Sequence, residues 1–168
     1  KLDFFEEGVI IILVPAITLK DEIEKAFAKE LYTEKYFFYT GYGTCNSIPE
    51  IIAEDCRYDY GIVDSDEILI GFLSYSLNDN VDCIYNFGLY SFDKGNPIIG
   101  RDLFSKLSEL VKHHHRIEWR MIGGNPVKKH YDKFCIEHGG NIVHLHDVCK
   151  DFNGNYHDEY IYEIIKKV

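Results

Sequence analysis

The chain has 168 residues, of which 46% are hydrophobic and 15% aromatic, a composition that supports a packed core and excludes extensive disorder. Its 18 basic and 28 acidic residues leave a net charge of −10, which argues against nucleic-acid partners because these need a positive surface. The apolar run from Val9 to Val14 is too short to cross a membrane. We therefore expect a single domain over residues 1–168, located in the cytoplasm, without nucleic-acid or membrane partners.

The first third of the chain predicts one strand and two helices. The strand covers Gly8–Val14, and Thr18 is placed to cap a helix over Leu19–Tyr32. The aromatic, glycine-interrupted stretch Glu34–Cys45 predicts an ordered loop. A second helix is predicted over Ile48–Cys56, where a serine, a proline and a glutamate form a helix-start pattern.

Three strands follow, separated by short turns rich in aspartate and asparagine. Their predicted bounds are Tyr60–Val63, Glu67–Leu77 and Ile84–Phe92. The third strand is rich in aromatic and aliphatic residues, which suits a strand buried on both faces. We expect it to lie at the centre of the sheet.

A helix with a strong start follows this central strand. Asn96 suits the N-cap, Pro97 suits the first helical position, and the apolar residues that follow to Val111 have the spacing of one buried stripe. The free N–H groups and the dipole at a helix N-terminus attract anions, and Lys94 and Arg101 add positive charge there. The unit is a candidate site for a phosphate-bearing cofactor. The alternative is a strand–loop–helix unit that only packs against its neighbours.

The last third predicts a strand, a helix and a hairpin. The strand covers Arg116–Ile122, and the helix begins at Asn125 and Pro126 and ends before two glycines at 139–140. Strands Asn141–Val148 and Tyr156–Ile165 complete the chain and would pair as a hairpin. Its exposed edge could pair with a second copy, so a homodimer is one expectation.

The five cysteines are widely spaced and form no Cys-x-x-Cys pair, which argues against a zinc ribbon or a thioredoxin-type site. We expect scattered buried thiols in a reducing compartment. The histidines form two groups, the run His113–His115 and the alternating pair His144 and His146, with His157 across the hairpin. No carboxylate or cysteine completes either group at a recognisable spacing, so no metal site is predicted. A metal- or pH-sensing module stays as an alternative.

The order strand, two helices, three strands, helix, strand, helix, two strands resembles the GNAT family of N-acetyltransferases over nearly the whole chain. The resemblance implies an α/β (α+β) fold, with a mixed, mostly antiparallel central sheet flanked by about four helices. It also implies an enzyme that transfers the acetyl group of acetyl-CoA to a small-molecule or peptide amine, by direct attack in a ternary complex. The alternative is a GNAT-fold protein that binds CoA or another ligand without catalysis.

The family holds the pyrophosphate of acetyl-CoA with a loop of pattern Arg/Gln-x-x-Gly-x-Gly/Ala. This pattern falls on the stretch from Gly95 to Gly100, and Gly100 is the position that matches. By resemblance, the residues that would bind the cofactor are Leu89, Tyr90, Ser91, Lys94, Gly95, Asn96, Ile98, Ile99, Gly100, Arg101 and Asn125.

Two further roles follow from the resemblance. Asn125 would hydrogen-bond the pantetheine part of the co-substrate, and Tyr131 would be the general acid that protonates the leaving thiolate. Free backbone N–H groups near Leu89, Tyr90 and Ser91 would bind the cofactor and the thioester carbonyl. Gly88 would suit a bulge in that strand.

The acceptor side is less defined by the sequence. The general base could be Glu67, Asp82 or Glu118, each next to a predicted strand, and each could equally be a surface acid. The segment 34–59 usually forms the acceptor site in the family, and here it would supply an aromatic and acidic wall suited to a cationic amine. The alternative is a loop packed over the core. The wall would consist of Tyr36, Tyr39, Tyr42, Glu50, Glu54 and Asp55.

Overall fold

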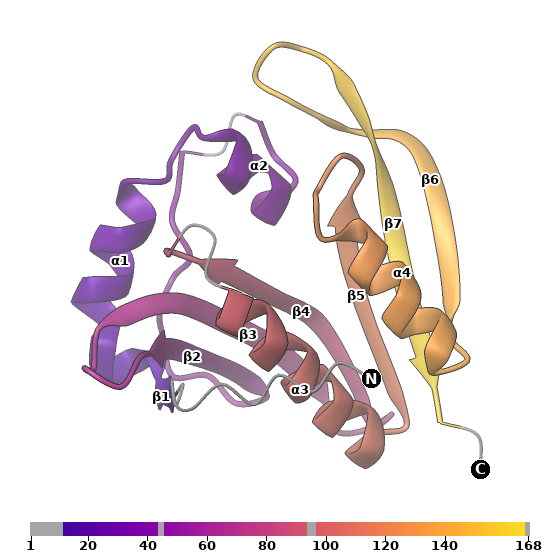
Figure 1. Cartoon of the computed structure of the whole chain (residues 1–168), viewed down its shortest axis with the longest axis horizontal. Coiled ribbons are helices and arrows are strands. Elements are labelled where there is room, and N and C mark those ends of the chain that lie inside the picture. Colours follow the sequence, from indigo (N-terminus) through magenta and orange to yellow (C-terminus); the bar gives the residue numbers. More distant parts are fainter. Residues whose placement is uncertain (1–11, 44–45, 94–96, 167–168) are drawn as a thin grey trace.

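The computed structural model describes residues 12–43, 46–93 and 97–166 (Figure 1). In chain order, its elements are β1 (Ile12–Pro15), the 3-10 helix η1 (Ala16–Leu19), α1 (Lys20–Ala28), α2 (Glu34–Thr40), β2 (Arg57–Val63), β3 (Leu69–Asn78), β4 (Cys83–Ser91), α3 (Pro97–His113), β5 (Arg116–Ile122), α4 (Lys128–Glu137), β6 (Asn141–Lys150) and β7 (Tyr156–Ile165). By type, this order of strands and α-helices agrees with the prediction, but the second helix lies at Glu34–Thr40 instead of the predicted Ile48–Cys56.

The seven strands form one sheet in the order β1-β2-β3-β4-β5-β7-β6. Neighbouring strands are antiparallel except β4 and β5, which are parallel. Among the described residues, β4 and β5 pair only through Cys83 with Arg116 and Ile84 with Ile117. Beyond these pairs the two strands diverge, and the sheet opens into two wings (Figure 1). The predicted mixed, mostly antiparallel sheet is confirmed.

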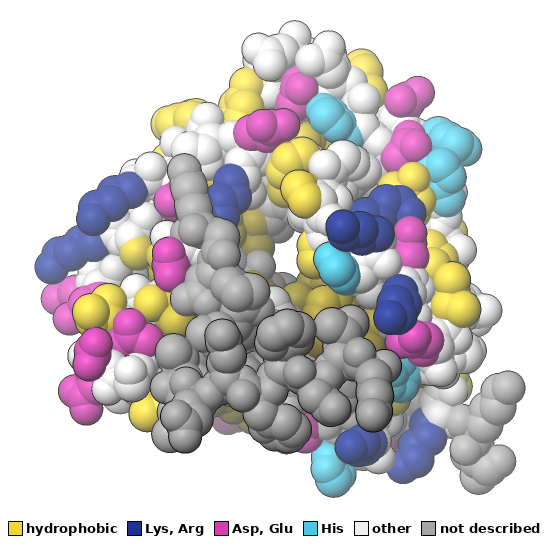
Figure 2. Space-filling view, in the orientation of Figure 1, with side chains coloured by type: hydrophobic (Ala, Val, Ile, Leu, Met, Phe, Trp, Pro, Cys, Tyr) yellow, Lys and Arg dark blue, Asp and Glu magenta, His cyan; other side chains and the backbone are white. Residues whose placement is uncertain are grey.

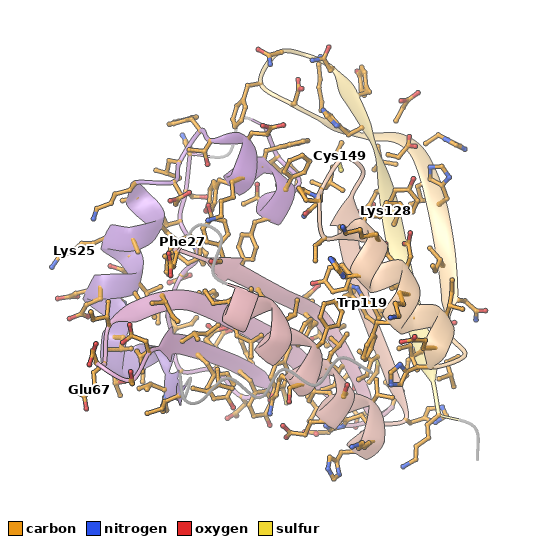
Figure 3. All side chains as sticks on the ribbon, viewed as in Figure 1. Lys25, Phe27, Glu67, Trp119, Lys128 and Cys149 are labelled. Atoms are coloured by element: carbon orange, nitrogen blue, oxygen red, sulfur yellow. The ribbon has the colours of Figure 1, made fainter. Side chains whose placement is uncertain are left out.

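The helices cover both faces of the sheet, as the alternation of side chains along a strand requires. On β3, Leu73 belongs to the larger core cluster with α3 and α4, whereas its neighbour Phe72 belongs to a cluster with α1 and α2. Trp119 on β5 lies within the larger cluster, and Phe27 on α1 lies within the smaller one (Figure 3). Each face of the sheet therefore has its own packed helix layer, and the larger cluster extends over strands of both wings.

The start of α1 differs from the prediction. Thr18 does not cap this helix: it lies in η1, its hydroxyl donates to the carbonyl of Pro15 just before η1, and the helix begins at Lys20. Pro15 was expected to stop the first strand, but it pairs with Tyr60 as the last residue of β1. Part of that predicted strand, Gly8 to Ile11, lies outside the described residues. The helix also ends earlier than predicted, at Ala28.

The predicted loop at 34–45 is wrong over most of its length, because α2 occupies Glu34–Thr40. Thr33 caps this helix by accepting a hydrogen bond from the N–H of Tyr36, and Gly41 ends it with a φ of 79°. The aromatic run hides a helical pattern: Tyr36 and Phe37 face the core, and residues on the other side line the cleft described below.

The helix predicted over Ile48–Cys56 is also wrong, since the described residues there form no helix. Three contacts with residues outside this segment hold it in an irregular path. The Tyr36 hydroxyl donates to the carbonyl of Ser47 at 2.6 Å, and Arg57 donates to the carbonyl of Glu50 at 2.8 Å. Ile51 is buried in the α1 cluster. Contacts from elsewhere in the chain outweigh the local helix-start pattern.

Most of the remaining elements agree closely with the prediction, although β2 begins at Arg57, three residues before its predicted start at Tyr60. Strand β5 has the predicted bounds, and β4 and β7 differ by at most one residue. Helix α4 begins at Lys128 instead of Asn125, because the Asn125 side chain accepts the N–H of Val127 and forms a turn before the helix. The cysteines expected to be buried include Cys83, which is buried, and Cys56, which is exposed. No helix in the described part of the chain is long and apolar enough to span a membrane.

Candidate functional site

A cleft of about 1230 Å³ lies where β4 and β5 diverge. Its walls come from both strands, from α2, and from the first turns of α3 and α4. Figure 2 shows a hollow in the middle of this face, with hydrophobic side chains inside it and basic side chains along its right rim. A cleft at the point where parallel strands separate is a common place for ligand binding in α/β folds.

The diverging edge of β4 offers backbone groups to this cleft. The N–H of Phe92 donates to the carbonyl of Ile70 on β3 at 2.8 Å. Because alternate residues of an antiparallel strand point their N–H groups to opposite sides, Tyr90 also faces β3, whereas Leu89 and Ser91 face β5. The free edge that the sequence suggested around residues 89–91 thus consists of Leu89 and Ser91.

Tyr90 lines the cleft, but its side chain has a structural role. Its ring is buried in the α1 cluster, and its hydroxyl donates to Glu30 at 2.7 Å. Burial, followed by the hydrogen bond to Glu30, raises the pKa of Tyr90 well above its ordinary value. The Ser91 side chain is turned locally, since it donates to the carbonyl of Asp93 at 2.6 Å.

Lys35 lies in the same place, and the sequence reasoning missed it. Its ammonium group donates to the carbonyl of Ser91 and lies 4.6 Å from the centre of the Tyr90 ring. Both contacts put a positive charge beside the free edge of β4. The sequence carried no signal for this role, because the residue was assigned to a loop and its partners are more than 50 positions away.

The strand β4 contains a bulge beside the cleft. Its register with β3 shifts between Ser74 and Ser76, and Asn86 has a φ of 53°. The sequence suggested a bulge at Gly88. The left-handed residue is instead Asn86, two positions earlier, which fits the tolerance of asparagine for this conformation. At Gly88 the space is limited: an added Cβ would lie 3.3 Å from the Tyr39 ring.

The predicted phosphate loop is described only in part. Lys94, Gly95 and Asn96 lie outside the described residues, as do the side chains of Ile98 and Arg101. What is described fits the expectation of a helix start at the cleft. Helix α3 begins at Pro97, and both Ile99 and Gly100 line the cleft.

Gly100 makes the first turn of α3 easy to approach. Apart from its chain neighbours and the backbone of its own helix, no atom of the described residues lies within 4 Å of the position that a Cβ at Gly100 would occupy. An anionic group can therefore come close to the N–H groups and the positive end of the helix dipole. The described residues of the cleft thus fit a ligand with a phosphate-bearing part and an extended arm that pairs with a strand edge.

Asn125 and Tyr131, the two residues near the start of α4 that were predicted to act on the co-substrate, both line the cleft. Tyr131 is 7% exposed, and its ring packs against Trp119 and Phe104, with 5.6 Å between ring centres in each case. Its hydroxyl has no hydrogen-bond partner within the described chain. Burial raises the pKa of Tyr131 far above its ordinary value, so the phenol keeps its proton at neutral and mildly alkaline pH.

The side of the cleft formed by α2 carries aromatic side chains, since Phe38, Tyr39 and Tyr42 line it. Glu118 from β5 also lines the cleft. Burial raises the pKa of Tyr39 to about 12. Glu118 receives a hydrogen bond of 2.9 Å from Arg116.

Of the acceptor-side residues suggested by the sequence, only some reach the cleft. Tyr39 and Tyr42 do, but Tyr36 is buried behind them. The three acidic residues of the predicted wall do not line the cleft in the described chain, because the segment that carries them is irregular instead of helical. They are Glu50, Glu54 and Asp55.

The three candidate bases are widely separated. Glu118 lines the cleft. Glu67 lies in the turn between β2 and β3, at the far left of the molecule and well away from Trp119 in the cleft (Figure 3). Asp82 is at the closed end of the opening, where it accepts hydrogen bonds from the His114 side chain and the N–H of His115. Glu118 is therefore the one of these three that the fold brings to the cleft.

Comparison with known proteins shows which fold this is. No protein-family signature and no curated protein matches the sequence. Solved structures do match. A GNAT-superfamily phosphinothricin acetyltransferase from Sinorhizobium meliloti, determined in complex with acetyl-CoA, is 13% identical with a TM-score of 0.67, over 94% of this chain and 88% of that chain.

Two further structures agree. The ribosomal-protein-S18-alanine N-acetyltransferase from Escherichia coli is 15% identical with a TM-score of 0.61, over 96% of each chain. An N-acetyltransferase from Staphylococcus aureus Mu50 is 12% identical with a TM-score of 0.63, over 96% of this chain and all of that one. The chain therefore has the fold of the GNAT acetyltransferases, as its order of elements predicted.

Proposed function

We propose that this GNAT-fold chain is an N-acetyltransferase, which moves the acetyl group of acetyl-CoA to an amine. The observation that carries the proposal is the opening between β4 and β5, where the N–H groups of Leu89 and Ser91 face a large cleft. An acyl transfer needs such donors, because negative charge develops on the carbonyl oxygen in the transition state. The named acetyltransferases with this fold support the proposal.

The co-substrate would lie along the cleft in an extended form. Its pyrophosphate would sit against the first turn of α3, where Ile99 and Gly100 line the cleft, and Lys94 and Arg101 remain predicted contributors of charge. Asn125, at the opposite wall, would bond the pantetheine amides. Acetyl-CoA supplies the activated acetyl group, and the chain supplies its alignment.

Tyr131 would protonate the leaving sulfur. A general acid must carry its proton when it is needed, and burial keeps the phenol of Tyr131 neutral. Its hydroxyl has no partner in the described chain, so it is available to a ligand. The ring is fixed by packing against Trp119 and Phe104, which sets its direction before the co-substrate binds.

The acceptor amine would enter from the α2 side and attack directly. Tyr39, Tyr42 and Phe38 give this side an aromatic surface, and Glu118 is placed to take a proton from the amine, directly or through a water molecule. The acceptors named for two neighbours, phosphinothricin and the alanine of a ribosomal protein, differ in size and share an amine. We therefore propose a small-molecule or peptide amine as the acceptor.

Thermal melting with acetyl-CoA tests binding, because a ligand that binds the folded state raises its melting temperature with concentration. We expect a clear rise at about 100 times Kd, where the gain is about 2.7 kcal/mol, and a smaller rise with dephospho-CoA. Release of free thiol on adding amines then tests turnover. No melting shift at millimolar acetyl-CoA would contradict the proposal.

A second candidate is a protein of this fold that binds CoA or another ligand without turnover. The observation in its favour is the loop pattern, of which only Gly100 matches the family. The same experiment separates the two functions. A melting shift with acetyl-CoA, without thiol release for any amine in a broad screen, would favour the binding protein.

A further inference from the structure

Three metal-binding side chains meet on the β6–β7 hairpin, outside the cleft. His144 Nε2 lies 2.6 Å from one carboxylate oxygen of Asp158, and His146 Nδ1 lies 3.6 Å from the other. The three ligand atoms lie within 4.8 Å of one another. Figure 2 shows histidine and acidic side chains gathered at the upper right of the molecule, over this hairpin.

The local backbone explains why they converge. His144 and His146 are two positions apart on β6, so they share a face. The register of β6 with β7 shifts between Leu145 and Cys149, a stretch that includes His146, and Asp147 has a φ of 54°. This bulge leaves the ladder interrupted at the level of Asp158, and the two imidazoles and the carboxylate fill the interruption.

The carboxylate and one imidazole are already oriented. The N–H of Asp147 donates to Asp158 Oδ1 at 3.2 Å, and the carbonyl of Asp158 accepts the N–H of Gly123 at 2.7 Å. The His144 ring stacks on Tyr160, with 4.6 Å between ring centres and 11° between the ring planes. Outer contacts of this kind orient the ligands of metal sites in proteins.

The distances suit a zinc ion after a small separation of the side chains. Ligand atoms about 2.0–2.1 Å from a tetrahedral ion are about 3.3 Å apart, which lies between the two distances observed here. Two imidazoles and one carboxylate form a known ligand set for zinc, with water in the remaining position. The histidines are solvent-exposed, so an ion can enter without unfolding.

We propose that His144, His146 and Asp158 bind a zinc ion, which joins β6 to β7 where their hydrogen-bond ladder is interrupted. The sequence predicted no metal site because Asp158 is 12 positions beyond His146. The hairpin brings the carboxylate to the pair. The proposal is independent of acetyl transfer, since none of the three residues lines the cleft.

Two other histidine–aspartate pairs show what is special about this group. His157 lies 3.1 Å from Asp151 on the same hairpin, and His114 lies 2.7 Å from Asp82. In the described chain neither pair has a third ligand within reach. They are ordinary ion-pair or hydrogen-bond contacts, and they provide matched controls.

Zinc binding is tested by calorimetry with a protein that carries no histidine tag. We expect one ion per chain, and a loss of affinity of at least about 100-fold in His146→Gln, since even outer-sphere changes cost about 10–100-fold. This residue is 76% exposed, so the variant should fold normally in chelator. The matched control His157→Gln should bind zinc as the unmodified protein does.

A second readout tests the ligand set itself. Cobalt(II) in place of zinc should give visible absorption bands, and Asp158→Asn should weaken or shift them. Hydrogen exchange at the β6–β7 bulge should slow on adding zinc. Equal zinc affinity in the unmodified protein and His146→Gln, or an equal loss in His157→Gln, would overturn the proposal.

Discussion

Tyr131 and Tyr162 share one aromatic cluster and differ in their hydroxyl groups. Both rings contact Trp119, with centres 5.6 Å and 5.1 Å away. The Tyr162 hydroxyl donates to Asp132 at 2.8 Å, whereas the Tyr131 hydroxyl has no partner within the described chain. The hydroxyl of Tyr162 therefore stabilises the fold, whereas the hydroxyl of Tyr131 can bond a ligand in the cleft.

Replacing Tyr131 with phenylalanine tests its role as the acid. We expect kcat to fall about 100-fold, in the range typical of general acid catalysis, with little change in the melting temperature. Because burial raises the pKa of Tyr131, activity that depends on this proton should persist past pH 10 in the unmodified enzyme. Rate profiles against pH check this expectation.

The control is Tyr162→Phe, which removes a phenol from the same cluster. Its loss of the bond to Asp132 should reduce the free energy of unfolding by about 1 kcal/mol and leave kcat unchanged. Unchanged turnover in Tyr131→Phe across the alkaline range would show that another group, or water, supplies the proton.

Glu118 has a similar matched partner in Glu163. Arg116 contacts both carboxylates, at 2.9 Å and 2.6 Å, but of the two only Glu118 lines the cleft. We expect Glu118→Gln to reduce kcat/KM about 100-fold, because the amide cannot accept the proton of the amine. Glu163→Gln should leave kcat/KM nearly unchanged. The same loss in both variants would mean that Arg116, and not the base, causes it.

At the scale of elements, the first turn of α3 decides how closely an anion can approach. Gly100 is exposed, and its missing side chain leaves open space at the cleft. Gly100→Glu should weaken acetyl-CoA binding at least about tenfold, because a carboxylate would occupy that space and oppose the pyrophosphate. Titration of acetyl-CoA by calorimetry measures the effect.

Gly100→Ala is the control for this helix. Alanine fits the open space and favours the helix, so it should raise the free energy of unfolding by about 0.5–1 kcal/mol. Its effect on acetyl-CoA affinity should be small. If the glutamate and alanine variants bind acetyl-CoA equally, the pyrophosphate does not lie at this turn.

The molecule as a whole depends on the closed end of the opening, where the two wings of the sheet join. Asp82 lies there with a φ of 47°. Its carboxylate accepts hydrogen bonds from the His114 ring at 2.7 Å and the N–H of His115 at 2.8 Å, and its carbonyl accepts the N–H of Arg116. This residue ties the start of β4 to the end of α3 and the start of β5.

These contacts predict how stability changes with acid. The hydrogen bond from His114, and then that from the His115 N–H, holds the pKa of Asp82 below its ordinary value. A group whose pKa is lowered on folding stabilises the folded state above its unfolded pKa of about 4, and this stability is lost as the pH falls through the lower, folded value. Asp82→Asn should therefore melt earlier than the unmodified protein at pH 7, and the difference should shrink as the pH falls below the ordinary pKa of the carboxyl group.

Asparagine tolerates the positive φ of this position, so the variant isolates the charge. Melting curves at several pH values provide the measurement. A difference in melting temperature that stays constant down to pH 2 would show that the carboxylate charge is not the cause.

The homodimer through the β6 edge remains a prediction, which the molecular mass in solution would test.

The local signals in the sequence were strong for most of the sheet. Alternating or apolar runs bounded by turn residues predicted β4, β5 and β7 to within one residue, because hydrophobic pattern determines which segments can be buried as strands. The same reasoning failed between residues 34 and 56. There the aromatic run is helical and the apparent helix is irregular, since Ile51 and Ser47 are held by contacts with distant elements.

The order of elements in the sequence was enough to identify the fold and to propose Asn125 and Tyr131, both of which line the cleft. Only the tertiary structure shows that Lys35 contacts Ser91 and that Asp158 lies beside a pair of histidines. It also shows that, of the three candidate bases, Glu118 is the one that lines the cleft. Each of these involves residues far apart in the chain. A one-dimensional pattern carries local preferences and burial, whereas the distance between remote side chains is set by where β4 and β5 separate and where β6 bulges.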